Sequence, residues 1–178
     1  MPVTINLKFI LIQGLGIVGA GIYFLSYQFK GNKKLFRTQM FSFICYSLHF
    51  ILLGAITGAL SNLVNLLRSY FLSSNKKELH SKWACALICA LLGLVCIFTW
   101  SGTQSLLPVI GNAAVTIGGY LHSEKKLRLI MIFFNAPVWI TYDFIVGSWV
   151  GVIDETITLI AVLISVYRIG WNNLDKKE

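Results

Sequence analysis

The sequence predicts an all-α integral membrane protein with seven transmembrane helices, arranged 3-1-3 as two parallel three-helix repeats around a linker helix. Of its 178 residues, 56% are hydrophobic and only 12% are charged, whereas soluble domains carry about 25% charged residues. Seven apolar runs each approach the roughly 20 residues that a bilayer-crossing helix needs. Basic residues concentrate at alternate connections, as in multi-pass proteins. Little chain remains outside the helices, so residues 1–178 are predicted to form a single transmembrane domain.

Each predicted helix is an apolar run bounded by polar or glycine-containing connections. The predicted helices span 7–28, 35–54, 56–73, 83–100, 105–122, 127–146 and 148–169. The connections are Lys30–Lys34, Gly54–Thr57, Ser73–Lys82, Ser101–Gln104, Ser123–Lys126 and Gly147–Gly151. No small-residue cleavage site follows the first run, which predicts a retained helix rather than a signal peptide. Pro137 is expected to kink the sixth helix.

The basic residues fix the predicted orientation. With seven helices, the N-terminus and Lys8 lie on one side, and the other fourteen Lys and Arg residues lie on the opposite side. These fourteen are Lys30, Lys33, Lys34, Arg37, Arg68, Lys76, Lys77, Lys82, Lys125, Lys126, Arg128, Arg168, Lys176 and Lys177. Because cytoplasmic loops are rich in Lys and Arg, the N-terminus is predicted outside and the C-terminus in the cytoplasm. The net charge of +8 is thereby assigned to membrane topology, and no nucleic-acid partner is expected.

An internal repeat supports the 3-1-3 arrangement. Residues 32–35 (NKKL) match residues 124–127 (EKKL) at an offset of 92, and Gly19 falls on Gly111 at the same offset. One residue later in register, Gly54, Gly58 and Asn62 match Gly147, Gly151 and Glu155. The two repeats are therefore predicted at 7–73 and 105–169, with 83–100 as the linker. Four helices separate equivalent elements, which predicts a parallel repeat around an axis normal to the membrane.

No catalytic motif is present, so the chain is not predicted to be an enzyme. The sequence contains no nucleophile elbow, no His-Glu-x-x-His zinc motif and no phosphate-binding loop. Its four cysteines, Cys45, Cys85, Cys89 and Cys96, lie inside apolar runs without accompanying His or carboxylate ligands. They are interpreted as small packing residues rather than metal ligands. No metal and no cofactor are predicted.

Two stretches resemble the YgjV-type bacterial inner-membrane proteins. The first contains Leu25–Gln28, Asn32–Lys34, Gln39, Leu48–Phe50 and Leu53–Ala55; the second contains Pro137–Asp143, Gly147–Trp149 and Glu155. The resemblance covers nearly the whole chain. It implies a multi-pass protein of the bacterial inner membrane and, because that family is largely uncharacterised, no particular activity.

The 3-1-3 arrangement also resembles the SWEET sugar facilitators, the PQ-loop proteins and the PnuC-type vitamin transporters. Tyr27–Gln28 stands where a PQ-loop protein has Pro-Gln, and the second half has Gly119–Tyr120 there. Because neither half has the Pro-Gln pair, the resemblance does not indicate a particular substrate. In SWEET-like proteins the third helix of each half lines the pocket, and this nominates Asn62 or Asn65 together with Glu155 or Thr158.

Polar side chains within the predicted spans give the candidate site, because such groups are costly in a bilayer. Five of them lie roughly four to seven residues inside the outer helix ends, using about 1.5 Å per residue. They are His49, Asn62, Asn112, Asp143 and Glu155. Trp139 is deep enough to stack on a solute. The predicted substrate-binding set is therefore His49, Asn62, Asn65, Asn112, Trp139, Asp143, Glu155 and Thr158.

Two functions remain open on the sequence. The first is a small-solute transporter or facilitator that binds a polar solute between its halves, passively or coupled to protons through Asp143 or Glu155. The second is a membrane scaffold or partner subunit whose polar residues only hydrogen-bond between helices. The expected partners are membrane lipids and, for the first function, a small polar solute; a homo-oligomer is left open.

Overall fold

The computed structural model describes residues 7–52, 56–100, 102–145 and 149–175 and is helical in nearly all of them. The α-helices are α1 (Leu7–Ser26), α2 (Asn32–Leu52), α3 (Ile56–Ser73), α4 (Lys82–Phe98), α5 (Leu106–Tyr120), α6 (Glu124–Ile130), α7 (Ala136–Ile145) and α8 (Trp149–Ile169). Short 3-10 turns occupy Lys77–His80, Thr103–Ser105 and Trp171–Asn173. The all-α prediction is confirmed, with boundaries close to the predicted ones.

Local signals explain several of the helix ends. Ser81 precedes α4 and its side chain accepts a hydrogen bond from the Ala84 amide at 3.2 Å. Ser123 precedes α6 and accepts one from the Lys126 amide at 3.3 Å. These are N-caps, which satisfy amides that have no partner in the first turn. Gly170, with φ of 85°, follows α8, where a residue with a side chain would be strained.

The predicted sixth helix is continuous but irregular. Helices α6 and α7 are joined by a π-helical turn, Met131–Asn135. Pro137 is the second residue after this turn. It has no amide proton, and its ring obstructs the carbonyl four residues earlier, which lies within the turn. A π turn is one of the recognised ways in which a helix accommodates such a disturbance.

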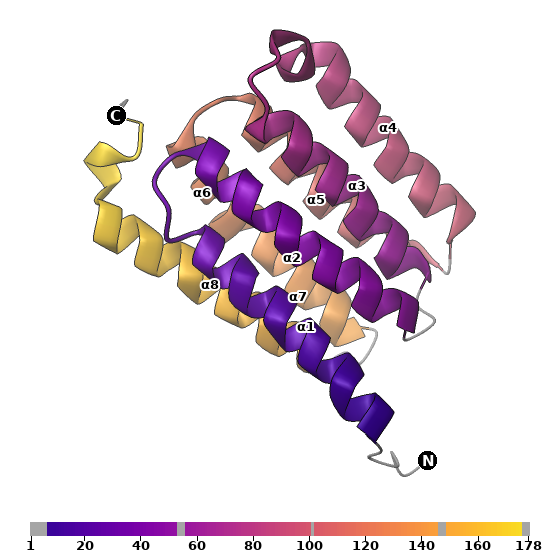
Figure 1. Ribbon diagram of the computed structural model, residues 1–178. Coiled ribbons are helices and arrows are strands. Elements are labelled where there is room, and N and C mark those ends of the chain that lie inside the picture. The colour runs from indigo at the N-terminus through magenta and orange to yellow at the C-terminus, as the bar shows by residue number, and fades with distance from the viewer. Residues whose placement is uncertain (1–6, 53–55, 101, 146–148, 176–178) are drawn as a thin grey trace.

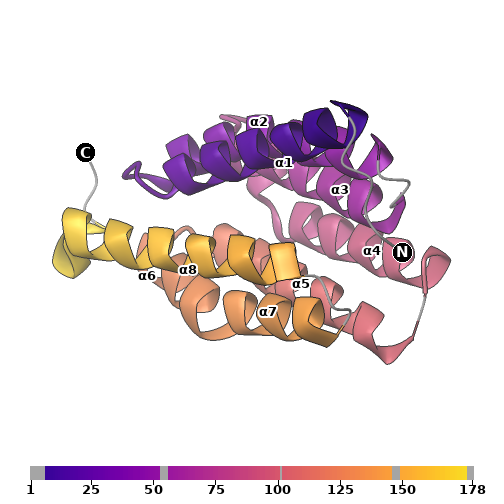
Figure 2. The ribbon, with the colours of Figure 1, turned by 90° about the horizontal axis from the view of Figure 1, so that it is seen from below.

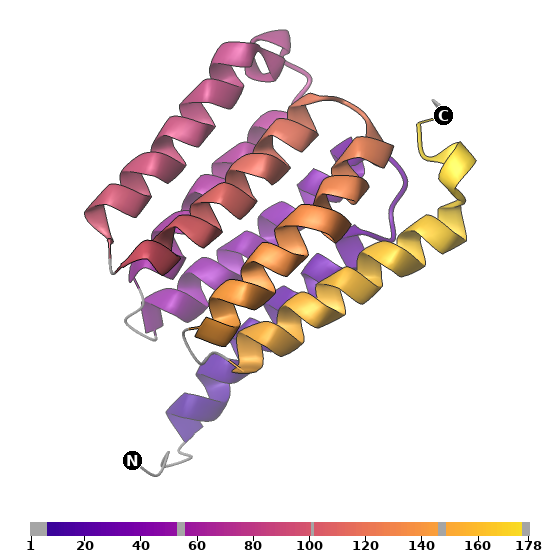
Figure 3. The ribbon, with the colours of Figure 1, turned by 180° about the vertical axis from the view of Figure 1, so that it is seen from behind.

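When α6 and α7 are taken as one helix, consecutive helices run antiparallel, so the connections gather at two ends of the molecule (Figure 1). The N-terminus lies at one end and the C-terminus at the other (Figures 1 and 3). The C-terminal end also carries the connections 27–31, 74–81 and 121–123. Lys30, Lys33, Lys76, Lys77 and Lys125 lie in or next to these connections. We call this end the basic end.

The helices form two layers with α4 at their side. Figure 2 shows α1, α2 and α3 in one layer and α5, α6, α7 and α8 in the other. Within each layer the middle helix packs against both outer ones: α2 against α1 and α3, and the α6–α7 helix against α5 and α8. Between the layers α1 packs on α8 and α3 packs on α5, while α4 contacts α3 and α5.

Large apolar side chains cover the outside, and many polar ones are buried. Trp83, Phe98 and Tyr167 are 85%, 81% and 91% exposed. Arg68 and Arg128 are among the largest fully buried side chains. This inverts the usual distribution of a water-soluble protein, in which arginine is almost never fully buried unless it is paired. By length and hydropathy together, no helix in the described part of the chain meets the requirement for crossing a membrane.

Candidate functional site

Three buried polar residues meet where α3 packs on α5. The Asn65 amide nitrogen donates to the Asn112 side-chain oxygen at 3.4 Å, and the Arg68 guanidinium donates to the Asn112 backbone carbonyl at 3.5 Å. All three side chains are buried, with exposed fractions of 6% or less. We call Asn65, Arg68 and Asn112 the polar centre. The sequence predicted Asn65 and Asn112 as binding residues but counted Arg68 only as a charge that sets topology.

The polar centre has unused hydrogen-bonding capacity. The buried Asn65 Oδ1, Arg68 Nε and Asn112 Nδ2 atoms make no hydrogen bond to the residues that the structure describes, and the Oγ of neighbouring Ser69 makes none either. Arg68 also lies over the ring of Phe43, with 5.7 Å between the guanidinium carbon and the ring centroid. Buried polar atoms are nearly always paired in folded proteins. The centre therefore has one side-chain acceptor and two side-chain donors, counting Arg68, that are not used.

Other predicted binding residues are committed to helix backbones. His49 on α2 contacts the Ile12 carbonyl of α1 through Nδ1 at 2.8 Å. The Asn62 amide donates to the Gly58 carbonyl one turn earlier at 2.8 Å. Each contact uses one side-chain nitrogen, and within the described residues neither side chain is hydrogen-bonded to the polar centre. Both roles of these two residues, packing and solute binding, stay predictions.

The remaining predicted residues lie on α7 and α8. Trp139 on α7 packs edge-on against Tyr142, with ring centroids 5.8 Å apart. Thr158 is buried on α8. Glu155, also on α8, is half-buried and lies within electrostatic range of Tyr23 and Tyr46. The side chain of Asp143 lies outside the described residues. Among the predicted residues whose side chains are described, Asn65 and Asn112 share a hydrogen bond, and His49, Asn62 and Trp139 make other contacts.

A second pairing between the layers involves Asp154, next to Glu155. The Tyr46 hydroxyl of α2 donates to Asp154 Oδ2 on α8 at 3.0 Å. The Asp154 carboxylate is thus held by a side chain of the opposite layer. Nothing in the spacing of the sequence pairs residues 46 and 154.

The two layers repeat one packing device. A side chain on Gly19 of α1 would meet Tyr46 of α2, and one on Gly111 of α5 would meet Trp139 of α7. Gly19 and Gly111 are the pair matched by the sequence repeat, and Tyr46 and Trp139 are 93 residues apart. In both layers the first helix thus brings a glycine against an aromatic ring of the middle helix, which permits close helix contact.

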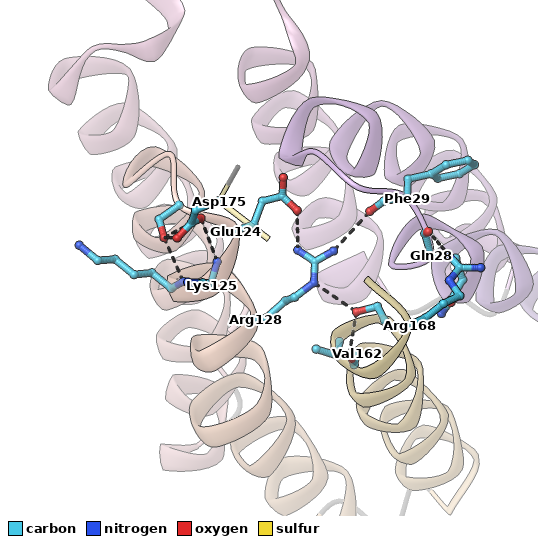
Figure 4. Close-up of polar contacts among 11 residues, drawn as sticks. Gln28, Phe29, Glu124, Lys125, Arg128, Val162, Arg168 and Asp175 are labelled. Atoms are coloured by element: carbon cyan, nitrogen blue, oxygen red, sulfur yellow. Dashed lines mark hydrogen bonds and ion pairs between the residues drawn. The ribbon is translucent and has the colours of Figure 1, made fainter. Parts of the chain in front are cut away.

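A network at the basic end surrounds the second buried arginine, Arg128 (Figure 4). Its Nε donates to Ser165 Oγ of α8 at 3.2 Å, and its Nη2 donates to the Phe29 carbonyl, after α1, at 3.3 Å. Its Nη1 lies 3.3 Å from Glu124 Oε2 one turn earlier. Arg128 therefore joins α6, α8 and the α1–α2 connection, a role that the sequence did not predict. Burial raises the pKa of Glu124 and outweighs the opposing effects of a Gly31 backbone hydrogen bond and of Arg128.

Gln28 makes further contacts between the layers at the same end. Its amide nitrogen donates to the Ala161 carbonyl of α8 at 3.2 Å. The Arg168 guanidinium donates in turn to the Gln28 carbonyl (Figure 4). Gln28 is the residue that aligned with the glutamine of the PQ-loop proteins. Its contacts show how this position can join the two layers even though the preceding residue is Tyr27 rather than proline.

A small pocket of about 40 Å³ lies toward the other end of the molecule. It is lined by Ser61, Val95, Cys96, Thr99, Ser105, Pro108, Val109 and Tyr142. None of the predicted binding residues is among these. Its volume is of the order of one or two water molecules, so it cannot hold a sugar or an amino acid in this conformation.

Comparison with known proteins identifies the family. Residues 10–173 match a family described as Bacterial inner membrane protein, Imp-YgjV. No curated protein matches the chain, and no solved structure does. The resemblance drawn from the sequence is confirmed for this family, while the likeness to SWEET, PQ-loop and PnuC-type proteins stays a prediction. Because the match covers nearly the whole chain, the protein belongs to the Imp-YgjV family of bacterial inner membrane proteins.

Proposed function

We propose that the chain is a multi-pass protein with seven transmembrane helices, its N-terminus outside and its C-terminus in the cytoplasm. Family membership supports the inner membrane. The apolar exterior and the buried polar interior suit a lipid surrounding, in which polar groups must turn inward. The basic end supports the orientation, because cytoplasmic connections are rich in Lys and Arg.

We further propose a small-solute transporter or facilitator that binds a polar solute between two three-helix halves, α1–α3 and α5–α8. One observation carries this proposal. In the two halves α1 corresponds to α5, and α3 corresponds to α8. Exchanging the halves therefore turns the α1–α8 contact into an α5–α3 contact, and the structure has both contacts. That is the relation expected for parallel repeats around an axis along the membrane normal, an arrangement that transporters use.

The basic-end contacts suit a gate in such a transporter. Gln28 and Phe29 of the first half are bonded to Ala161 and Arg128 of the second half. A solute could leave toward the cytoplasm only if these bonds opened. Alternating access would accordingly break them in one state and keep them in the other.

The alternative, a non-transporting scaffold or partner subunit, is favoured by a different observation. His49 and Asn62 each contact a backbone carbonyl of a helix through one side-chain nitrogen, as residues that only hold helices together would. Interhelical polar contacts of this kind stabilise membrane bundles by about 0.6 kcal/mol each without any transport role.

Solute permeation through proteoliposomes separates the two proposals. Purified protein would be reconstituted, and swelling in iso-osmotic solutions of small polar solutes would be followed by light scattering. A transporter should admit at least one solute faster than empty liposomes do, and a Gln28→Ala variant should change that rate. A scaffold should match empty liposomes for every solute tested.

Reporter fusions test the topology. Fusions after Glu178 and within 73–82 should report cytoplasm, and fusions near 101–104 should report the outside. A cytoplasmic report near 101–104 would reject the seven-helix topology, because consecutive helices would no longer alternate in direction across the membrane.

A further inference from the structure

Arg68 and Arg128 are equally buried but very differently paired. Arg128 uses its three nitrogens on a carboxylate, a hydroxyl and a carbonyl. Arg68 donates once, to the Asn112 carbonyl at 3.5 Å, and its Nε has no partner. Within the described part of the chain, this is the one hydrogen bond that the Arg68 side chain makes. An unpaired buried cation is strongly destabilising.

The surroundings of Arg68 are those of an incomplete binding site. Asn65 and Ser69 lie on its own helix, and Asn112 faces them from the other half. Each of the three has a buried side-chain atom without a hydrogen-bond partner. The two hydrogen bonds that hold the centre, at 3.4 and 3.5 Å, are longer than the usual 2.9–3.0 Å. Loosely held groups can turn toward a ligand at small cost.

We propose that Arg68 binds the carboxylate of a small organic anion at the interface between the halves. The guanidinium fork matches the two oxygens of a carboxylate, which would supply the missing counter-charge. The Asn112 and Ser69 side chains offer hydrogen-bond donors for the same group, and Asn65 Oδ1 offers an acceptor for a polar remainder. The guanidinium carbon lies over the Phe43 ring, 5.7 Å from its centroid. This inference rests on the proposed function, because it takes the interface between the halves as the place where the solute binds.

Thermal unfolding of the purified full-length protein in detergent tests binding without requiring transport. Acetate, propionate and succinate would each be compared with the corresponding amide at constant ionic strength in sodium chloride. At least one carboxylate should raise Tm by roughly 5–10 °C when present about 100-fold above its Kd. The matching amide should leave Tm unchanged. Equal shifts from acid and amide, stabilisation by inorganic phosphate alone, or no shift would each overturn the proposal.

Two variants locate the site, and a third controls for surface charge. Arg68→Gln should abolish the carboxylate shift. Asn65→Asp places a carboxylate of the chain itself beside Arg68, so it should raise the ligand-free Tm and also abolish the shift. Arg37→Gln, which removes an exposed charge near the same end, should retain it. If Arg68→Gln does not fold, Asn65→Asp decides: a carboxylate shift as large as that of the wild type overturns the proposal.

The outcome is independent of the transport question. Carboxylate binding in detergent without permeation into proteoliposomes would keep the Arg68 site and reject the transporter. Permeation of neutral solutes without any carboxylate-dependent shift would keep the transporter and reject the site.

Discussion

Replacing Arg128 by lysine tests whether the hydrogen bonds of its guanidinium stabilise the fold or whether the residue only adds a charge on the cytoplasmic side. Arginine makes three contacts, with Ser165, Glu124 and the Phe29 carbonyl. A lysine keeps the charge but has one compact donor group, which cannot reach three partners in different directions. At least two contacts should be lost. Hydrogen bonds to charged groups contribute about 1.5–3 kcal/mol each, so losing two of them in Arg128→Lys should lower the free energy of unfolding by about 3–6 kcal/mol.

The expected shift is large enough to measure. For a chain of this size, 1 kcal/mol corresponds to roughly 2–4 °C in Tm, so Arg128→Lys should lower Tm by at least about 6 °C. A thiol-reactive dye can report unfolding, because Cys96 is buried and Cys85 and Cys89 are half-buried. Arg37→Lys is the matched control, since Arg37 is exposed at the same end. Equal Tm values for the two variants would refute the reasoning and leave Arg128 as a topological charge alone.

Three further predictions concern local packing, protonation and capping, and each is checked by the same Tm measurement. Gly119→Ala places a methyl group 2.5 Å from Leu72 Cδ1 and should destabilise the protein by about 1–3 kcal/mol. Gly93→Ala, where the space is open, should stabilise it by about 0.5–1 kcal/mol. A higher Tm for Gly119→Ala than for Gly93→Ala would contradict the close α3–α5 contact. Burial raises the pKa of Glu124, which means that the folded state holds the proton of this carboxyl more tightly than the unfolded state does. The protein should therefore lose stability as the pH rises through the folded-state pKa of Glu124. Glu124→Gln should flatten this dependence, and an unchanged pH profile would disprove it. Ser81→Ala removes the α4 cap and should cost about 1 kcal/mol; no loss would show that the cap is dispensable.

The hydrophobic runs and the polar connections between them were sufficient to predict the helices. The predicted 56–73 and the observed α3 coincide, because a polar connection bounds the apolar run at its C-terminal end. The start of α2 was predicted three residues late, because Asn32, Lys33 and Lys34 are polar yet form its first turn. Hydropathy marks where a helix is apolar rather than where its backbone becomes helical.

The candidate site was harder to predict, because its parts come from distant positions. Asn112 was predicted from its polarity inside an apolar run and Asn65 from the resemblance to SWEET-like proteins, and the two do meet. His49 and Asn62 have the same sequence signal but bond to nearby backbone. Polarity within a helix shows that a partner is needed, but not which group supplies it. Arg68 and Arg128 were missed because the count of charges that set the topology already accounted for them.

The π turn at Met131–Asn135 explains a detail of the repeat. Residues 32–35 match 124–127 at an offset of 92, but Tyr46 and Trp139, beyond the turn, correspond at 93. A π turn is a helix with one inserted residue, so the second half carries an insertion in its middle helix and absorbs it within a single turn. Deleting Phe133, which is 74% exposed, should therefore restore an ordinary α-helical turn and keep Trp139 against Gly111. The same deletion in a regular helix would rotate every later side chain by about 100°.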